Sequence, residues 1–128
     1  GKQWKQYYLD LYKEKSEGWL RAQFFFKKLS KYCQSKNIQL LLVNYPELHQ
    51  LQPYPFGIVT QKLENLAKQQ EVLFFDLLTI LQGQKEENLW VSRQDQHPNS
   101  FACKLIAQAI KDTFLNYFYL NKPVHQDL

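Results

Sequence analysis

The spacing of apolar residues predicts four helices along this chain. In four segments apolar side chains recur three or four residues apart, as they do on one face of a helix. The last segment is the most regular, and Asn99 or Ser100 precedes it as a candidate N-cap. The four stripes are Trp4, Tyr8, Leu11 and Tyr12; Trp19, Ala22, Phe26, Leu29 and Cys33; Val59, Leu63, Leu66 and Ala67; and Phe101, Leu105, Ile106, Ala109, Ile110 and Phe114.

Two nearly continuous apolar runs of strand length lie between these helices. They cover residues 38–45 (IQLLLVNY) and 71–77 (EVLFFDL). Unbroken apolar strands are typical of parallel sheets that helices cover on both faces. Pro46 ends the first run, and residues 47–55 are expected to form a loop. The alternation of strands and helices predicts an α/β fold with right-handed crossovers.

A sheet of two parallel strands leaves an apolar edge without a partner. Natural proteins avoid such edges, because unpaired backbone groups attract other strands. We therefore expect missing polypeptide, or a second copy of this chain, to cover the edge, and the chain alone to self-associate. The chain begins with Gly1 and contains no Met, which favours an excised piece of a longer protein.

Length and composition indicate one ordered domain or fragment spanning residues 1–128. The chain is 45% hydrophobic and 16% aromatic, which excludes a disordered protein by composition. No apolar run reaches the length of about 18 residues that a membrane span needs, so no transmembrane segment is expected. The polar tail at residues 121–128 is expected to fray.

The net charge of +4 is unevenly distributed. Residues 1–36 contain nine basic and three acidic side chains, a net charge of +6, and the remainder carries −2. The simple interpretation is a solvated helix face; the alternative is a surface that meets an anionic polymer or membrane headgroups. Aromatic residues are interleaved there at helical spacing, which favours packing over base stacking, so no nucleic-acid partner is expected.

The cysteines and two of the three histidines suggest no metal or cofactor site. Cys33 and Cys103 are too few and too far apart for a zinc motif, and are expected to be buried free thiols on helices. A bridge between them stays open. His49 and His125 have no ligand partners at metal-binding spacing, and are expected on the surface or in loops. No cofactor signature is present.

The most informative stretch is residues 94–100, QDQHPNS. It places Asp95 two residues before His97, on a loop that Pro98 and Asn99 turn into a helix. If the loop curls, the carboxylate reaches Nδ1–H of the imidazole, fixes its tautomer and leaves Nε2 as an acceptor. Such a pair supplies two members of an acyl-transfer triad. The alternative is that Asp95 and Asn99 only cap the helix, with His97 on the surface.

These residues resemble the last sequence block of the SGNH (GDSL-type) hydrolases. In that family an Asp, one or two residues, a His and commonly Pro-Asn precede the C-terminal helix, as in Asp95-Gln96-His97-Pro98-Asn99. The surrounding LLLVNYPEL, FFDLL and LWVSRQDQHPN are also similar, and the likeness covers roughly residues 19–120. The resemblance implies a three-layer flavodoxin-like fold of five parallel strands, of which the two strands here are the last.

The resemblance also implies a function that this chain cannot complete alone. In the family, Asp and His complete a Ser-His-Asp triad, and these roles carry over to Asp95 and His97. The nucleophilic Ser lies in a Gly-Asp-Ser block, and Gly and Asn blocks supply the oxyanion hole; none of these blocks is present here. The serines that lack this context are Ser16, Ser30, Ser35, Ser92 and Ser100. Of these, Ser92 and Ser100 lie near His97 in sequence but have simpler roles in a loop and a cap.

The chain is therefore interpreted as the C-terminal half of an esterase or O-acyl (acetyl) hydrolase. The substrate implied is an ester or acetylated carbohydrate, and the location implied is extracytoplasmic or in the cell envelope. The piece alone is expected to be inactive, because it lacks the attacking atom and the preorganised donors.

Three further polar residues end the strands. Asp76 ends the second strand, where α/β sheets often place functional groups, although such a carboxylate also often caps the next helix. Asn44 and Tyr45 end the first strand on the same edge of the sheet, and are candidates to line a pocket beside His97.

A second hypothesis belongs to another class of protein. It takes the chain as a non-catalytic α/β module whose basic N-terminal helices bind a partner or an envelope polymer. The Asp95–His97 loop would then be structural.

Overall fold

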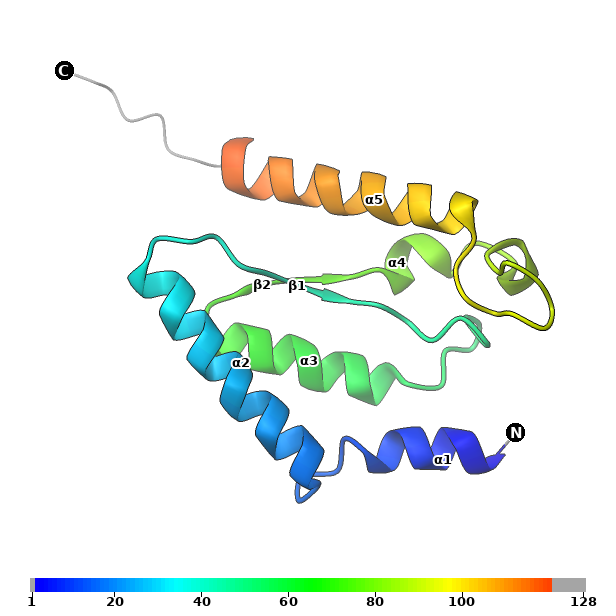
Figure 1. Cartoon of the computed structure of the whole chain (residues 1–128), viewed down its shortest axis with the longest axis horizontal. Coiled ribbons are helices and arrows are strands. Elements are labelled where there is room, and N and C mark those ends of the chain that lie inside the picture. The colour runs from blue at the N-terminus through cyan, green and yellow to red at the C-terminus, as the bar shows by residue number, and fades with distance from the viewer. Residues whose placement is uncertain (1, 121–128) are drawn as a thin grey trace.

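Helices lie on both faces of a small parallel sheet in the computed structural model, which describes residues 2–120 (Figure 1). The elements are α1 Lys2–Asp10, α2 Glu17–Ser35, β1 Leu41–Asn44, α3 Gly57–Gln69, β2 Leu73–Asp76, α4 Leu78–Leu81 and α5 Ser100–Leu115, with a 3-10 turn at Glu86–Asn88 and a π-helical turn at Asn116–Leu120. All four predicted helices and both predicted strands are confirmed. The expected frayed tail at 121–128 lies outside the described residues.

The two strands form a parallel pair, as the apolar runs predicted. The register runs from Leu41 opposite Leu73 to Asn44 opposite Asp76. Helix α5 lies on one side of the strands and α3 on the other, where α3 contacts both strands (Figure 1). The described part of the chain is therefore a mixed α/β fold with a helix–sheet–helix arrangement. Within it the sheet has two strands.

Both strands are four residues long, which is shorter than the apolar runs that predicted them. The first residues of each run instead close the preceding helix. Asn37 and Glu71 take positive φ angles of 54° and 55°. The next residue in each case donates its backbone N–H to a carbonyl of the helix. Ile38 donates to Cys33 at 2.8 Å, and Val72 donates to Ala67 at 2.9 Å. These are the left-handed helix ends that satisfy the last carbonyls of a helix, and they delay the start of each strand.

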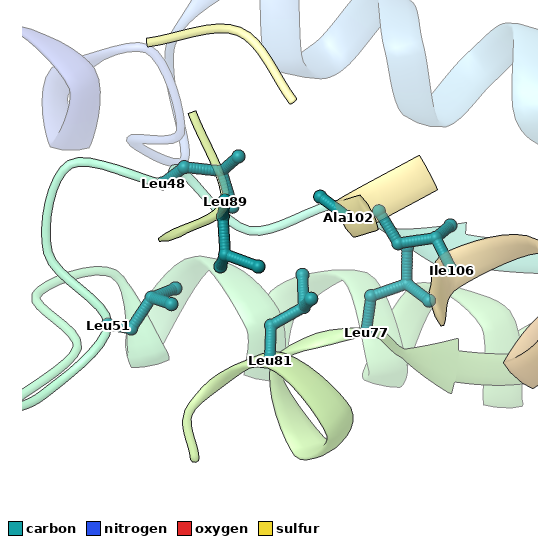
Figure 2. Close-up of a cluster of buried hydrophobic side chains, with 7 residues drawn as sticks. All are labelled: Leu48, Leu51, Leu77, Leu81, Leu89, Ala102 and Ile106. Atoms are coloured by element: carbon teal, nitrogen blue, oxygen red, sulfur yellow. The ribbon is translucent and has the colours of Figure 1, made fainter. Parts of the chain in front are cut away.

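A cluster of buried side chains joins the ends of the strands to the loops that follow them. Figure 2 shows these side chains converging from the loop after β1, from the segment around α4 and from the start of α5. Its members are Leu48, Leu51, Leu77, Leu81, Leu89, Ala102 and Ile106. Leu48 and Leu89 belong to two different loops, so the core fixes these loops to the sheet and to each other.

The two cysteines differ in their surroundings. Cys33 is buried on the inner face of α2, as expected, and both thiols are free. Cys103 is exposed, so the expectation of a second buried thiol was wrong. Its neighbour Ala102 faces the core, and a residue one position further along a helix is turned about 100° away.

Helix α2 presents large apolar side chains on its outer surface as well as its inner one. Five of them are about half exposed: Leu20, Phe24, Phe25, Leu29 and Tyr32. The inner face buries Trp19, Ser30 and Cys33. No helix in residues 2–120, α2 included, is long and apolar enough to cross a membrane.

The core cluster predicts a large effect of truncating Leu89, whose side chain is fully buried. Leu89→Ala should lower the free energy of unfolding by about 2–5 kcal/mol, because it leaves a cavity beside the other leucines. Urea unfolding measures this as a lower midpoint with an unchanged slope. The exposed Leu20→Ala is the matched control and should change stability by no more than about 0.5 kcal/mol. Equal effects of the two substitutions would contradict this description of the core.

Candidate active site

The loop that contains Asp95 and His97 is closed at its base by backbone pairing. Trp90 and Pro98 form an isolated antiparallel bridge. The N–H of Val91 donates to the carbonyl of His97 at 2.9 Å. Residues 91–97 therefore form a tight turn that projects from the start of α5.

Ser92 shapes the tip of this turn. Its Oγ accepts the backbone N–H groups of Gln94 and Asp95 at 3.2 and 3.0 Å. Its own N–H donates to the carbonyl of Asp95 at 2.9 Å. A hydroxyl that accepts two backbone N–H groups has a structural role, which confirms the prediction that Ser92 serves the loop.

The turn brings the carboxylate of Asp95 onto the imidazole of His97. Oδ1 of Asp95 lies 2.6 Å from Nδ1 of His97 and accepts the backbone N–H of the same residue at 3.1 Å. Two hydrogen bonds lower the pKa of Asp95 below its ordinary value. The bond with the imidazole has the larger effect, and the bond with the backbone N–H has the smaller one. The predicted contact is therefore present. The His97 side chain is 88% exposed, and Nε2 is the ring nitrogen that the carboxylate does not contact.

Asn99 is the residue that caps α5, and it also closes the loop. Its side-chain oxygen accepts the N–H of Ala102 at 3.0 Å. Its Nδ2 donates to the carbonyls of Asn88 and Trp90 at 2.8 and 3.0 Å. Asp95 makes no such bond to α5, so the alternative in which both residues cap the helix holds only for Asn99.

A second acid–imidazole pair lies at the same place. Glu47 and His49, in the loop after β1, are hydrogen-bonded through Oε1 and Nδ1. This pair and the tip of the Asp95 turn line one open hollow of about 340 Å³. The lining residues are Glu47, His49, Gln94, Asp95, Gln96 and His97. The expectation that His49 lies in a loop is confirmed, but the sequence interpretation missed its carboxylate partner. The signal was available, because Glu47 and His49 have the same spacing as Asp95 and His97.

Two hydrogen bonds tie the loops that contain the two pairs. The indole N–H of Trp90 donates to the carbonyl of Leu48 at 3.1 Å. Leu48 lies between the acid and the imidazole of the second pair in the sequence. The N–H of Leu51 donates to Oε1 of Glu86 at 2.8 Å, and this bond lowers the pKa of Glu86. Together with the shared leucine core, they hold the two walls of the hollow in one arrangement.

The polar residues at the ends of the strands form a separate cluster. Asn44 is buried and donates to Oδ1 of Asp76 at 3.0 Å. The same oxygen accepts the N–H of Leu78 at 3.1 Å, so Asp76 caps α4, as the simpler interpretation predicted. Neither Asn44 nor Tyr45 lines the hollow beside His97, and that expectation was wrong.

The hollow contains no candidate serine or cysteine nucleophile among residues 2–120. No serine or cysteine lines it. Ser30 and Ser35 donate to carbonyls of their own helix. No group of three or more His, Cys, Asp or Glu side chains in the described residues is arranged to hold a metal ion. His125 lies outside them.

Comparison with known proteins finds no relative of this chain. No protein-family model matches the sequence, no curated protein matches it, and no solved structure matches the fold. Support for a function therefore comes from the hollow itself.

The hydrogen bonds of Asn99 predict a graded loss of stability. Asn99→Ala removes the cap and both side-chain donors, and should lower the free energy of unfolding by about 1–2 kcal/mol. Asn99→Ser keeps an acceptor for the N–H of Ala102 and places no charge beside the carbonyls of Asn88 and Trp90, so it should lose less. Urea unfolding of both variants measures the difference, and wild-type stability in Asn99→Ala would contradict the role of this side chain.

The contact between Asp95 and His97 predicts how the carboxylate titrates. In His97→Gln the pKa of Asp95 should rise toward 3.8, its ordinary value, and stop short of it because the backbone N–H still donates. Carbon NMR of the carboxyl group measures both values. Because the pKa is lowered in the folded loop, the ionised carboxylate stabilises that loop at pH values above its ordinary pKa. This stabilisation is lost as the pH falls through the lowered pKa. Asp10, whose pKa is lowered by Lys13, is the internal control and should not change. An unchanged pKa of Asp95 would contradict the contact.

Proposed function

We propose that this chain is the C-terminal half of an SGNH-type serine esterase or O-acyl hydrolase, and that Asp95 and His97 are its acid and base. The observation that supports this most is the Oδ1–Nδ1 contact of 2.6 Å at the mouth of an open hollow. A carboxylate on Nδ1 with Nε2 left for the reaction is the arrangement that a triad needs.

In this proposal His97 moves one proton in each half of the reaction. Nε2 takes the proton of a serine hydroxyl while the serine oxygen attacks the ester carbonyl. The same proton then passes to the alcohol that leaves, and an acyl-serine remains. His97 next takes a proton from water, whose oxygen attacks the acyl group, and returns it to the serine. Asp95 orients the ring and stabilises the imidazolium in both halves.

The nucleophile in this proposal comes from polypeptide other than residues 2–120. Two observations support that requirement: no described serine lines the hollow, and the His97 side chain is 88% exposed. An exposed base without positioned donors for the oxyanion lacks the electrostatic term that supplies most of the rate.

The same polypeptide would cover surface that is now open. A two-stranded parallel sheet has unpaired edges, and α2 exposes five large apolar side chains. In an SGNH-type domain of five strands the missing half would lie against such surfaces. A second copy of this chain is the alternative cover, and sedimentation velocity of the 128-residue chain distinguishes a dimer from a monomer.

The lining of the hollow favours a polar substrate. Its side chains are two carboxylates, two imidazoles and two amides, with no apolar residue among them. A long acyl chain would find no apolar contact there, whereas a short acyl group on a hydroxylated alcohol would find hydrogen-bond partners. The proposed substrate is therefore a short-chain ester such as an acetylated carbohydrate.

The test is an esterase assay on the protein from the complete reading frame that contains this chain. It should hydrolyse p-nitrophenyl acetate, and His97→Ala should lower kcat by at least about 10³-fold, because the base is removed. Asp95→Asn should also lower kcat by at least about 10³-fold, because it destabilises the imidazolium and the useful tautomer. Glu64→Gln, at an exposed position on α3, is the control and should keep full activity.

Three results would overturn the proposal. The first is a complete protein without esterase activity. The second is an active protein whose rate does not depend on His97. The third is turnover by the 128-residue chain alone that His97→Ala abolishes, because the proposal places the nucleophile elsewhere.

A second candidate function rests on the outer face of α2. Lys27, Lys28 and Lys31 are exposed there among the half-exposed apolar side chains, and Nζ of Lys28 lies 4.6 Å from the ring centroid of Phe24. Such a surface suits a non-catalytic module that binds an anionic partner. This function predicts no esterase activity in the complete protein, and loss of partner binding on replacing these lysines with Gln.

A further inference from the structure

We infer that Glu47 and His49 form a second, substrate-binding pair of the same site, and that His49 binds a hydroxyl of the alcohol part of the ester. This inference rests on the proposed function and names a specificity residue for it. The two pairs come from loops that are far apart in the sequence, yet they line one hollow of about 340 Å³. That volume is within the range of small-ligand sites.

The two pairs have the same internal chemistry. In each, a carboxylate two residues upstream engages Nδ1, so Nε2 is the nitrogen left for a ligand. A neutral imidazole held this way accepts a hydrogen bond at Nε2. A substrate hydroxyl donates such a bond, and both imidazoles line the hollow.

The surroundings of His49 favour binding over proton transfer. Its ring packs against the indole of Trp4, with 5.5 Å between the centroids, and Trp4 in turn packs edge-on against the buried Phe56. The backbone N–H of Glu47 donates to the hydroxyl of Tyr54 at 3.2 Å. The His49 side chain is 47% exposed, against 88% for His97. His49 is thus the more enclosed and more firmly held of the two imidazoles, as a positioning contact requires.

The position of His49 relative to His97 is also defined. Leu48 is buried in the core cluster together with Leu89, and its carbonyl accepts the indole N–H of Trp90. A ligand oxygen bound at one imidazole is therefore held at a set position relative to the other. An ion pair that only decorated the surface would not require the burial of Leu48 or the hydrogen bond from Trp90. Such a pair would also contribute little to the stability of the fold.

The charge of the hollow limits the class of ligand. Two carboxylates line it and no Lys or Arg does, which disfavours an anionic ligand. The remaining groups suit a neutral polyhydroxylated alcohol that carries a short acyl group.

The first experiment measures binding to the 128-residue chain by NMR, with glyceryl monoacetate as the probe. The imidazole signals of His49 and His97 are assigned with His49→Gln and His97→Gln. Both signals should shift along one binding curve. In His49→Gln the dissociation constant reported by His97 should rise about 3- to 10-fold, the loss of one hydrogen bond.

The controls separate a specific site from general solvent effects. Ethyl butyrate, an ester of similar size without hydroxyls, should shift neither signal. Glu47→Gln should weaken binding of glyceryl monoacetate, whereas Glu64→Gln, outside the hollow, should not. A shift of His97 without His49, or an unchanged dissociation constant in His49→Gln, would overturn the inference.

The second experiment distinguishes failure of this inference from failure of the proposed function. In the protein from the complete reading frame, His49→Gln should raise KM for glyceryl monoacetate about 3- to 10-fold and change kcat little. KM for p-nitrophenyl acetate should rise by a smaller factor, because this ester has no hydroxyl to donate to His49. Glu64→Gln, outside the hollow, should leave hydrolysis of both esters unchanged. If His97→Ala abolishes activity while His49→Gln leaves KM unchanged, only the role of His49 fails. If His97→Ala has no effect, the proposed function fails, and the NMR result still decides whether the two imidazoles share a ligand.

Discussion

The site depends on the burial of Leu48 and Leu89 in one core cluster. Each of these leucines lies in a loop beside polar residues that face the solvent, and their burial holds both loops against the sheet and α5. The hydrogen bond from Trp90 to the carbonyl of Leu48 then sets one loop relative to the other. Apolar burial supplies the stability, and the two part-buried hydrogen bonds between the loops supply the alignment.

The acid–imidazole pairs themselves contribute little to the stability of the fold. The side chains of Asp95 and His97 are largely exposed, and exposed ion pairs are weakened by solvent and salt. Their geometry comes instead from backbone hydrogen bonds in the turn, from Ser92 and from Asn99. A site built this way keeps its imidazole accessible while the supporting groups remain buried or bonded. That separation is typical of functional loops on a rigid scaffold.

Periodicity was sufficient to predict the helices and strands, because each has an apolar face or run of the right spacing. The strand ends were predicted too early, because Asn37 and Glu71 close the preceding helices with a backbone conformation that apolar patterns do not reveal. The apolar pattern also did not determine which side of α2 faces the core. Its apolar residues surround the helix, so the stripe that contains Leu29 was predicted while packing left Leu29 half exposed.

The pairing of Asp95 with His97 follows from local sequence, because two residues of separation within a tight turn bring the carboxylate back onto the ring. The cap at Asn99 is local for the same reason. The joining of this pair with Glu47 and His49 is a tertiary result. No spacing in the chain relates the two loops, and they meet because Leu48 and Leu89 are buried in one cluster with Leu77 and Leu81, the residues that follow β2. Side-chain chemistry is thus encoded in short motifs, whereas the composition of the hollow is decided by packing.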